Sequence, residues 1–77
     1  MAKSYKYSVM LAYDAGFIRV GCEMSHHNSK AAAFRSLHHF ENIYPKDGHD
    51  FYVEDNDTGR LVLEIKQRNS KGKWVVI

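Results

Sequence analysis

The sequence predicts a single α+β domain, an antiparallel sheet of four to five strands in the order β-β-α-β-β-β with one helix packed on one face. Apolar and polar residues alternate in both terminal parts of the 77-residue chain, and a stripe of helical spacing lies between them. Glycine-bearing turn segments separate the expected strands. A chain of this length accommodates one domain, so residues 1–77 are treated as one unit.

The N-terminal part is expected to be a β-hairpin. Alternating apolar residues run over 5–13 and again over 18–24, and a short segment ending in Gly16 separates the two runs. If Tyr13 pairs with Ile18, the larger apolar residues of both strands share one face, whereas a one-residue slip would bring charged residues there. The expected inner face consists of Tyr5, Tyr7, Val9, Leu11, Tyr13, Ile18, Val20, Cys22 and Met24.

Residues 28–44 are expected to form an amphipathic helix. Asn28 or Ser25 can cap its N-terminus, because the side-chain oxygens of these residue types accept hydrogen bonds from free backbone amides. Pro45 ends it, because the residue before a proline is pushed away from helical angles. The expected buried stripe is Ala33, Phe34, Leu37, Phe40 and Tyr44.

The C-terminal third is expected to complete the sheet with three strands. Two segments, Asn56–Gly59 and Asn69–Gly72, have the residue types of tight turns that end in a left-handed glycine. The first turn is expected to pair Val53 with Leu63, and the second returns the chain through its last four residues. On these registers the inward residues are Phe51, Val53, Leu61, Leu63, Ile65, Val75 and Ile77.

One helix covers one face of a sheet, so the other face is expected to be open. It would carry Trp74 and Tyr52 together with Lys66 and Arg68. A large aromatic side chain on a solvent face is unusual, and Trp, Tyr and Arg are enriched among residues that dominate binding energy. The same side chains can instead shield a thin sheet by packing over their neighbours. Both interpretations are open at this point.

Charge is unevenly distributed although the net charge is only +2. Residues 41–59 contain six acidic and one basic residue, and residues 60–77 contain five basic and one acidic residue. Basic side chains beside Trp74 suit contact with phosphates and stacking on a base, namely Lys66, Arg68, Lys71 and Lys73. Dedicated nucleic-acid-binding proteins usually have a larger basic excess. A solvated edge hairpin whose lysines discourage aggregation is the plainer interpretation.

Five histidines and one cysteine suggest a search for metal or catalytic sites. Cys22 with His26 and a helical histidine has no zinc-site spacing, and Cys22 is expected to face the core. The sequence has no nucleophile elbow and no phosphate-binding glycine loop. We therefore expect no catalytic residue, metal or cofactor. Arg35, His38 and His39 are expected on the exposed side of the helix, as a second candidate patch whose contacts would respond to pH near neutrality.

The expected compartment follows from what the sequence lacks. A single cysteine cannot form an internal disulfide, which fits a reducing environment. The first residues have no apolar core of a signal peptide, and no stretch approaches the ~20 apolar residues of a membrane span. We expect a cytoplasmic protein that does not bind membranes.

A hairpin runs into a short polar cap and an alanine-rich helix over Met24–Phe34, and a compact antiparallel sheet ends in Gly72–Ile77. In size and layout this resembles small proteins encoded by bacteriophages and mobile elements, including some anti-CRISPR proteins and the phage inhibitors of bacterial RNA polymerase. The resemblance implies a stoichiometric inhibitor in the cytoplasm of a bacterial host. It would bind a larger host protein or nucleoprotein complex and occlude a functional site. No contact residue carries over, because the resemblance is architectural.

The leading hypothesis is therefore a non-enzymatic protein-binding module of this inhibitor type. Its expected contact residues are Trp74, Tyr52, Arg68, Lys66, Lys71, Lys73, Arg35, His38 and His39. The alternative is a small nucleic-acid-binding protein that uses the basic C-terminal hairpin. A homodimer formed through the open face or the C-terminal edge strand is the third expectation.

Overall fold

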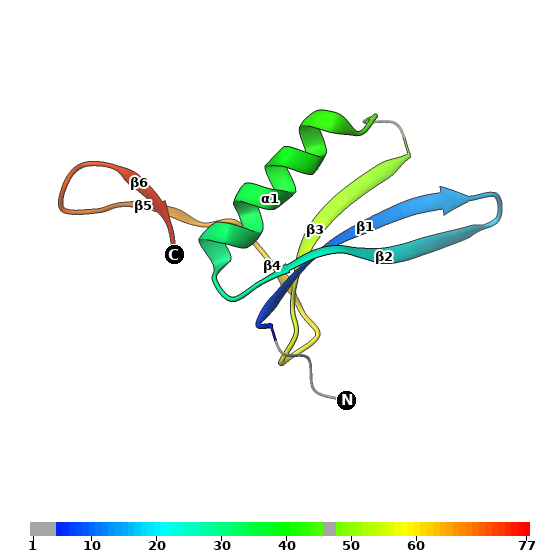
Figure 1. The fold of residues 1–77 in the computed structure, drawn as a ribbon, viewed down its shortest axis with the longest axis horizontal. Coiled ribbons are helices and arrows are strands. Elements are labelled where there is room, and N and C mark those ends of the chain that lie inside the picture. Colours follow the sequence, from blue (N-terminus) through cyan, green and yellow to red (C-terminus); the bar gives the residue numbers. More distant parts are fainter. Residues whose placement is uncertain (1–4, 46–47) are drawn as a thin grey trace.

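Helix α1 lies across one face of a four-stranded antiparallel sheet, and a separate two-stranded hairpin extends from the side of this unit (Figure 1). The computed structural model describes residues 5–45 and 48–77. The elements in chain order are β1 (Tyr7–Ala15), β2 (Ile18–His27), α1 (Lys30–Ile43), β3 (His49–Asp55), β4 (Leu61–Val62), β5 (Lys66–Arg68) and β6 (Trp74–Val76). The predicted α+β class and element order are confirmed, with the fourth predicted strand divided into β4 and β5.

The main sheet has the strand order β2-β1-β3-β4. Gly16, in the two-residue turn between β1 and β2, has a φ of 70°, which suits the first turn position of a tight hairpin. Tyr13 pairs with Val20, whereas Ile18 pairs with Ala15, so the register differs by two residues from the predicted one. Because the difference is even, the predicted alternation of faces is preserved.

A β-bulge changes that alternation at the far end of β2. Val9 lies opposite Ser25 and Met10 lies opposite Glu23, which leaves Met24 as the extra residue. Ser25 therefore takes the helix-side position that was predicted for Met24. Its hydroxyl lies 2.9 Å from that of Ser36 on α1.

Helix α1 begins one residue after its N-cap, Ser29. The Ser29 Oγ accepts a hydrogen bond from the Ala32 amide at 3.2 Å, so the cap is neither of the two predicted residues. The C-terminus is as predicted, because Tyr44 has extended backbone angles before Pro45. The core contains Val9 and Val53 of the sheet, packed against the buried helical residues Ala33, Phe34 and Leu37.

The far end of the β1–β2 hairpin extends beyond the helix (Figure 1). Ile18 is consequently 67% exposed although it lies on the predicted inner face. Cys22, which was predicted to face the core, is also exposed because it lies on the edge strand β2. The sheet face was thus predicted correctly here, but the helix does not cover all of it.

The prediction for the C-terminal strands was wrong in register. Val53 pairs with Val62, not with Leu63, because the turn closes one residue earlier through a hydrogen bond from the Asp55 amide to the Arg60 carbonyl. A one-residue slip moves every side chain to the opposite face. Val62 and Val76 accordingly pack against the core. The residues predicted to be inside are exposed instead, namely Leu61, Leu63, Ile65, Val75 and Ile77.

Candidate protein-interaction surfaces

The C-terminal arm, which we define as residues 63–77, leaves the main sheet and presents two different faces. Within it, Arg68 pairs with Trp74 and Lys66 pairs with Val76, so these four side chains share one face. Val76 packs against the core beside α1, and we call this the helix-side face of the arm. The opposite, outer face continues the exposed apolar residues of β4.

Trp74 and Arg68 form the most prominent feature of the helix-side face. Trp74 is 62% exposed, and the Arg68 guanidinium carbon lies 5.2 Å from the centre of its ring. This is a cation–π contact, which holds the ring and the guanidinium in a fixed relation while both stay accessible. Lys66 lies beside them and its Nζ is 3.8 Å from the Glu64 carboxylate.

His38 joins the helix to the arm. Its Nδ1 lies 2.9 Å from Glu41 on the same helix and its Nε2 lies 2.9 Å from Glu64 on the arm. Partial burial lowers the pKa of His38, but the hydrogen bonds and charges of the two carboxylates outweigh it, so the pKa is raised above 6.5. Glu64 thereby contacts both candidate patches, His38 from the helix and Lys66 from the arm.

The other two residues of the predicted helical patch do not reach the arm. Arg35 is exposed, and it lies close enough to β2 to act on His27. Partial burial, followed by the charges of His26 and Arg35, lowers the pKa of His27. The exposed His39 ring lies 5.8 Å from the ring of Phe40. The arm and the helical patch therefore meet through His38.

Tyr52 lies on the opposite face of the main sheet from the helix, as predicted, but it does not share a surface with Trp74. It is half-buried on β3, opposite Met10, and reaches across to β2. A Cβ atom placed on Gly21 would lie 3.9 Å from the Tyr52 hydroxyl. Tyr52 therefore covers the sheet, while Trp74 belongs to a second sheet on the helix side.

A polar cover on that same sheet face was not predicted. Ser8 is fully buried there, with its Oγ bonded to Glu23 and 3.1 Å from the Asn56 Oδ1. The Asn56 side chain donates to the Tyr5 carbonyl at 2.8 Å, and its backbone amide donates to the Lys6 carbonyl at 2.8 Å. The expected open face is thus closed at this end by the β3–β4 turn.

Lys71 and Lys73 are exposed in and after the turn at the tip of the arm. Their backbone amides both donate to the Asn69 Oδ1, at 2.9 and 3.0 Å. Gly72 has a φ of 77°, as the predicted left-handed turn glycine requires. The tip is therefore an ordered turn that presents two lysines.

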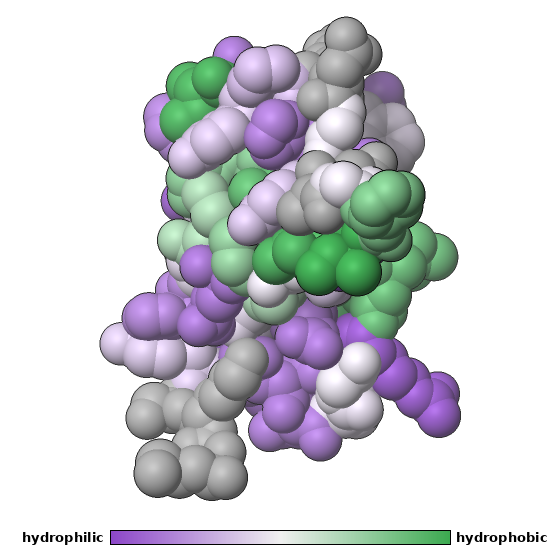
Figure 2. Space-filling model, turned by 90° about the vertical axis from the view of Figure 1, so that its right-hand side faces the viewer, coloured by the Kyte–Doolittle hydropathy of each residue, from purple (hydrophilic) through white to green (hydrophobic). Residues whose placement is uncertain are grey.

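Phe17 is an exposed aromatic residue that was not among the predicted contact residues. It occupies the turn between β1 and β2 with all of its side chain exposed, next to the exposed Ile18. Figure 2 views the molecule from this end, and hydrophobic residues gather in the middle of the face between hydrophilic ones. The available signal was a phenylalanine where tight turns favour Gly, Asn or Asp.

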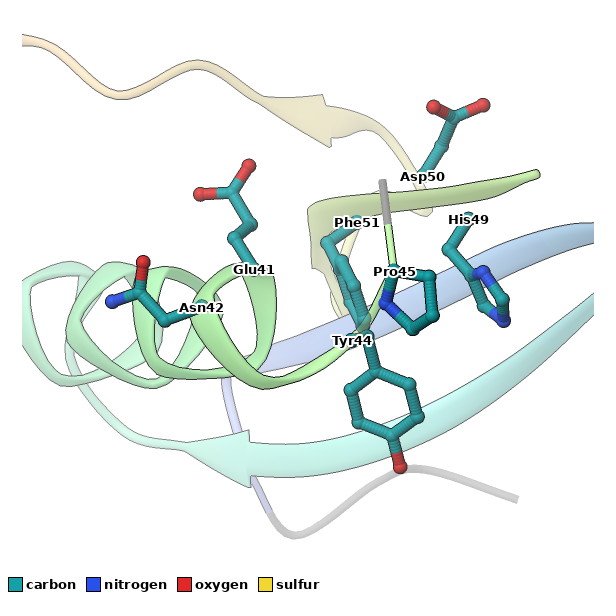
Figure 3. A pocket seen from close by; sticks show the side chains of 7 residues that line it. All are labelled: Glu41, Asn42, Tyr44, Pro45, His49, Asp50 and Phe51. Carbon is teal, nitrogen blue, oxygen red and sulfur yellow. The ribbon is translucent and has the colours of Figure 1, made fainter. Parts of the chain in front are cut away.

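A cavity of about 450 Å³ lies between the end of α1 and the start of β3 (Figure 3). Tyr44 and Phe51 line it with their ring centres 5.6 Å apart. The two carboxylates that line the cavity are Glu41 on α1 and Asp50 on β3. Each is bonded to a residue outside the cavity, Glu41 to His38 and Asp50 to Arg19. The arrangement gives no support to a catalytic carboxylate pair.

Within residues 5–45 and 48–77, no group of three or more His, Cys, Asp or Glu side chains is placed to hold a metal ion. None of the helical residues in the same ranges forms a segment long and apolar enough to cross a membrane. Comparison with known proteins gives no match to a family model, a curated protein or a solved structure.

Proposed function

We propose that this chain is a non-enzymatic protein-binding module that contacts a larger protein through the helix-side face of its C-terminal arm. The observation that carries the proposal is the exposed Trp74 ring with the Arg68 guanidinium 5.2 Å from its centre. Six of the ten exposed large hydrophobic residues of the described chain lie within residues 61–77, and Trp74 is the one of these six on the helix-side face. Apolar surface gathered in one segment is characteristic of interaction sites.

Trp74 is the anchor of the proposed interface. Trp and Arg are enriched among the residues that dominate binding energy, and here they are held together on an accessible strand pair. A partner that covers the ring would also enclose the Arg68 guanidinium, so a carboxylate on the partner is the group expected to meet it. His38, Glu64 and Lys66 would form the polar rim of this interface.

The charge pattern favours a protein over a nucleic acid as the partner. Arg68 already lies over the Trp74 ring on which a base would stack, and Glu64 already pairs with Lys66. Two of the four predicted phosphate-binding cations therefore have partners within the arm. In the mode that the phage-type resemblance implies, the bound module occludes a functional site of a larger host protein.

Nucleic-acid binding is the second candidate function, and the tip of the arm favours it. Lys71 and Lys73 are exposed near Arg68 and Trp74, without an ion pair of their own among the contacts resolved in the described chain. Phosphate contacts release counterions, so this mode requires a steep loss of affinity as salt rises. Contact with a partly apolar protein surface requires a much smaller loss.

Affinity capture from a lysate of the source organism tests the proposal. Wild type, Trp74→Ala and Phe17→Ala are compared with and without nuclease, because Phe17 is an exposed aromatic residue outside the arm. We expect wild type to capture a defined protein whether or not nuclease is added. Trp74→Ala should fail to capture this protein, and Phe17→Ala should still capture it. Loss of the captured material on nuclease treatment would support the nucleic-acid candidate instead. Equal capture by all three variants would contradict the role of Trp74.

A further inference from the structure

The outer face of the arm carries a continuous row of exposed aliphatic residues. We call it the apolar row, and its members are Leu61 (61% exposed), Leu63 (69%), Ile65 (54%), Val75 (39%) and Ile77 (50%). The Ile77 amide donates to the Ile65 carbonyl at 2.9 Å, so the end of the chain lies directly beside the start of the arm. The five side chains thus form one surface across two adjacent segments.

The charged residues of β5 lie on the opposite face from this row, and Lys73, which pairs with Asn69 next to the turn, lies on the same face as the row. The strand pairing places Gln67 opposite Val75 on the outer face, whereas Lys66 and Arg68 lie on the helix-side face. An isolated two-stranded hairpin is at best marginally stable, and it needs a further apolar layer to be firmly ordered. The helix-side face has that layer in α1, and in the described structure the outer face has none.

The two ends of the row carry opposite charges. At the Leu61 end lies the β3–β4 turn with the exposed Asp57, and at the far end lies the β5–β6 turn with the exposed Lys71 (Figure 1). Two copies turned by a twofold axis across the row would bring Asp57 of each copy to Lys71 of the other. The two ends of the row are therefore complementary in charge to each other in this antiparallel arrangement.

We propose that a second copy of this chain covers the apolar row, in a symmetric homodimer whose two rows pack against each other in antiparallel orientation. A standard interface takes about 800 Å² from each partner, roughly a seventh of the 5838 Å² of accessible surface of this chain. In the proposed dimer the row and its two flanking turns, within residues 57–77, would supply this area. The helix-side face with Trp74 stays exposed in both copies.

Light scattering over a wide range of protein concentration tests the dimer. We expect wild type to shift from monomer to dimer as concentration rises. Leu63→Asn should weaken the dimer by at least about tenfold in Kd, and Phe17→Asn should leave it unchanged. Both substituted side chains are exposed, so circular dichroism should report the same fold for both variants. A wild-type monomer at every concentration, or equal dimerisation of wild type and Leu63→Asn, would overturn the proposal.

Charge reversal tests the orientation of the two copies. Asp57→Lys and Lys71→Glu should each weaken the dimer, because each places like charges together at both ends of the row. Mixing the two variants should restore it, because the lysine introduced in one copy then meets the glutamate introduced in the other, and the native pair remains at the second end. A mixture no more dimeric than either variant alone would overturn the antiparallel arrangement.

The proposed dimer and the proposed function can be tested independently, because they use different faces of the arm. Trp74 lies on the other face of the arm, so Trp74→Ala should leave the monomer–dimer equilibrium unchanged. Leu63→Asn should still capture a protein partner through Trp74.

Discussion

The Nε2 atom of His38 lies 2.9 Å from a carboxylate oxygen of Glu64, which ties the middle of helix α1 to the root of the C-terminal arm. The second ring nitrogen faces Glu41 at the same distance. A histidine whose two nitrogens both face carboxylates donates two hydrogen bonds when it is protonated. The position of the arm is therefore coupled to the protonation of one side chain.

This contact predicts a pH dependence of stability. The pKa of His38 is raised in the folded protein, so its contribution is complete below the unfolded value of 6.5 and is lost as pH rises through the higher folded value. His38 is half-exposed, so the contribution should not exceed about 1 kcal/mol. Urea denaturation across this range should show wild type losing stability relative to His38→Gln as pH rises.

His39→Gln is the matched control, because His39 is the adjacent exposed histidine on the same helix. It should keep the wild-type pH dependence. An identical pH dependence in wild type and His38→Gln would contradict the coupling through Glu64.

Two neighbouring valines of β6 should respond differently to the same substitution. Val76 packs against the core and Val75 is exposed, the reverse of what the sequence predicted. In dilute protein, Val76→Asn should lower the free energy of unfolding by about 1–3 kcal/mol, because it places a polar group against apolar side chains. Val75→Asn should change it by less than about 0.5 kcal/mol. If urea denaturation shows a larger loss of stability for Val75→Asn than for Val76→Asn, the register predicted from the sequence would be correct and the one described here wrong.

Asn56 should contribute to the stability of the fold through the hydrogen bonds of its side chain. Its side chain bonds to the buried Ser8 and to the Tyr5 carbonyl, and its amide bonds to the Lys6 carbonyl. Asn56→Ala removes the two side-chain bonds and should cost about 1–3 kcal/mol. Asn42→Ala, on the exposed side of α1, should stay within about 0.5 kcal/mol. Equal midpoints of thermal unfolding for these two variants would show that the cover over Ser8 contributes nothing.

The turn that sets the β3–β4 register depends on Gly59. Its φ of 72° lies in the left-handed region, and no atom lies within 4 Å of a Cβ built there. The cost of Gly59→Ala is therefore one of backbone conformation, about 1–2 kcal/mol. Gly21→Ala has no such φ and meets its neighbours at ordinary contact distances of 3.8 and 3.9 Å, so it should be tolerated. If chemical denaturation shows Gly21→Ala to be less stable than Gly59→Ala, the left-handed conformation of Gly59 in this turn would be contradicted.

Local patterns predicted the elements well because each depends on neighbouring residues. The helical stripe around Phe34 and Leu37, the stop at Pro45 and the turn glycines at 59 and 72 all follow from short-range geometry. Alternation also identified correctly which residues share a face, as with Ile65, Val75 and Ile77.

Alternation could not decide which face the helix covers. On the C-terminal segment the larger apolar row, from Leu61 to Ile77, looked like the inner face, and a turn one residue shorter placed Val62 inside instead. The bulge at Met24 has no signal in the period-2 pattern. Of the candidate site, Trp74 and Arg68 were expected on one surface and are in contact, but Tyr52 lies elsewhere because the arm leaves the main sheet.

The most direct test of the proposed interface uses Trp74 itself, since it is the only tryptophan of the chain. Incorporation of 5-fluorotryptophan gives a single fluorine resonance that reports on the helix-side face of the arm. In a nuclease-treated lysate of the source organism, we expect this resonance to broaden and shift as the ring is covered by a larger protein, and Arg68→Glu should reduce the change. A sharp and unshifted resonance from intact protein in that lysate would contradict the claim that this face binds a protein partner.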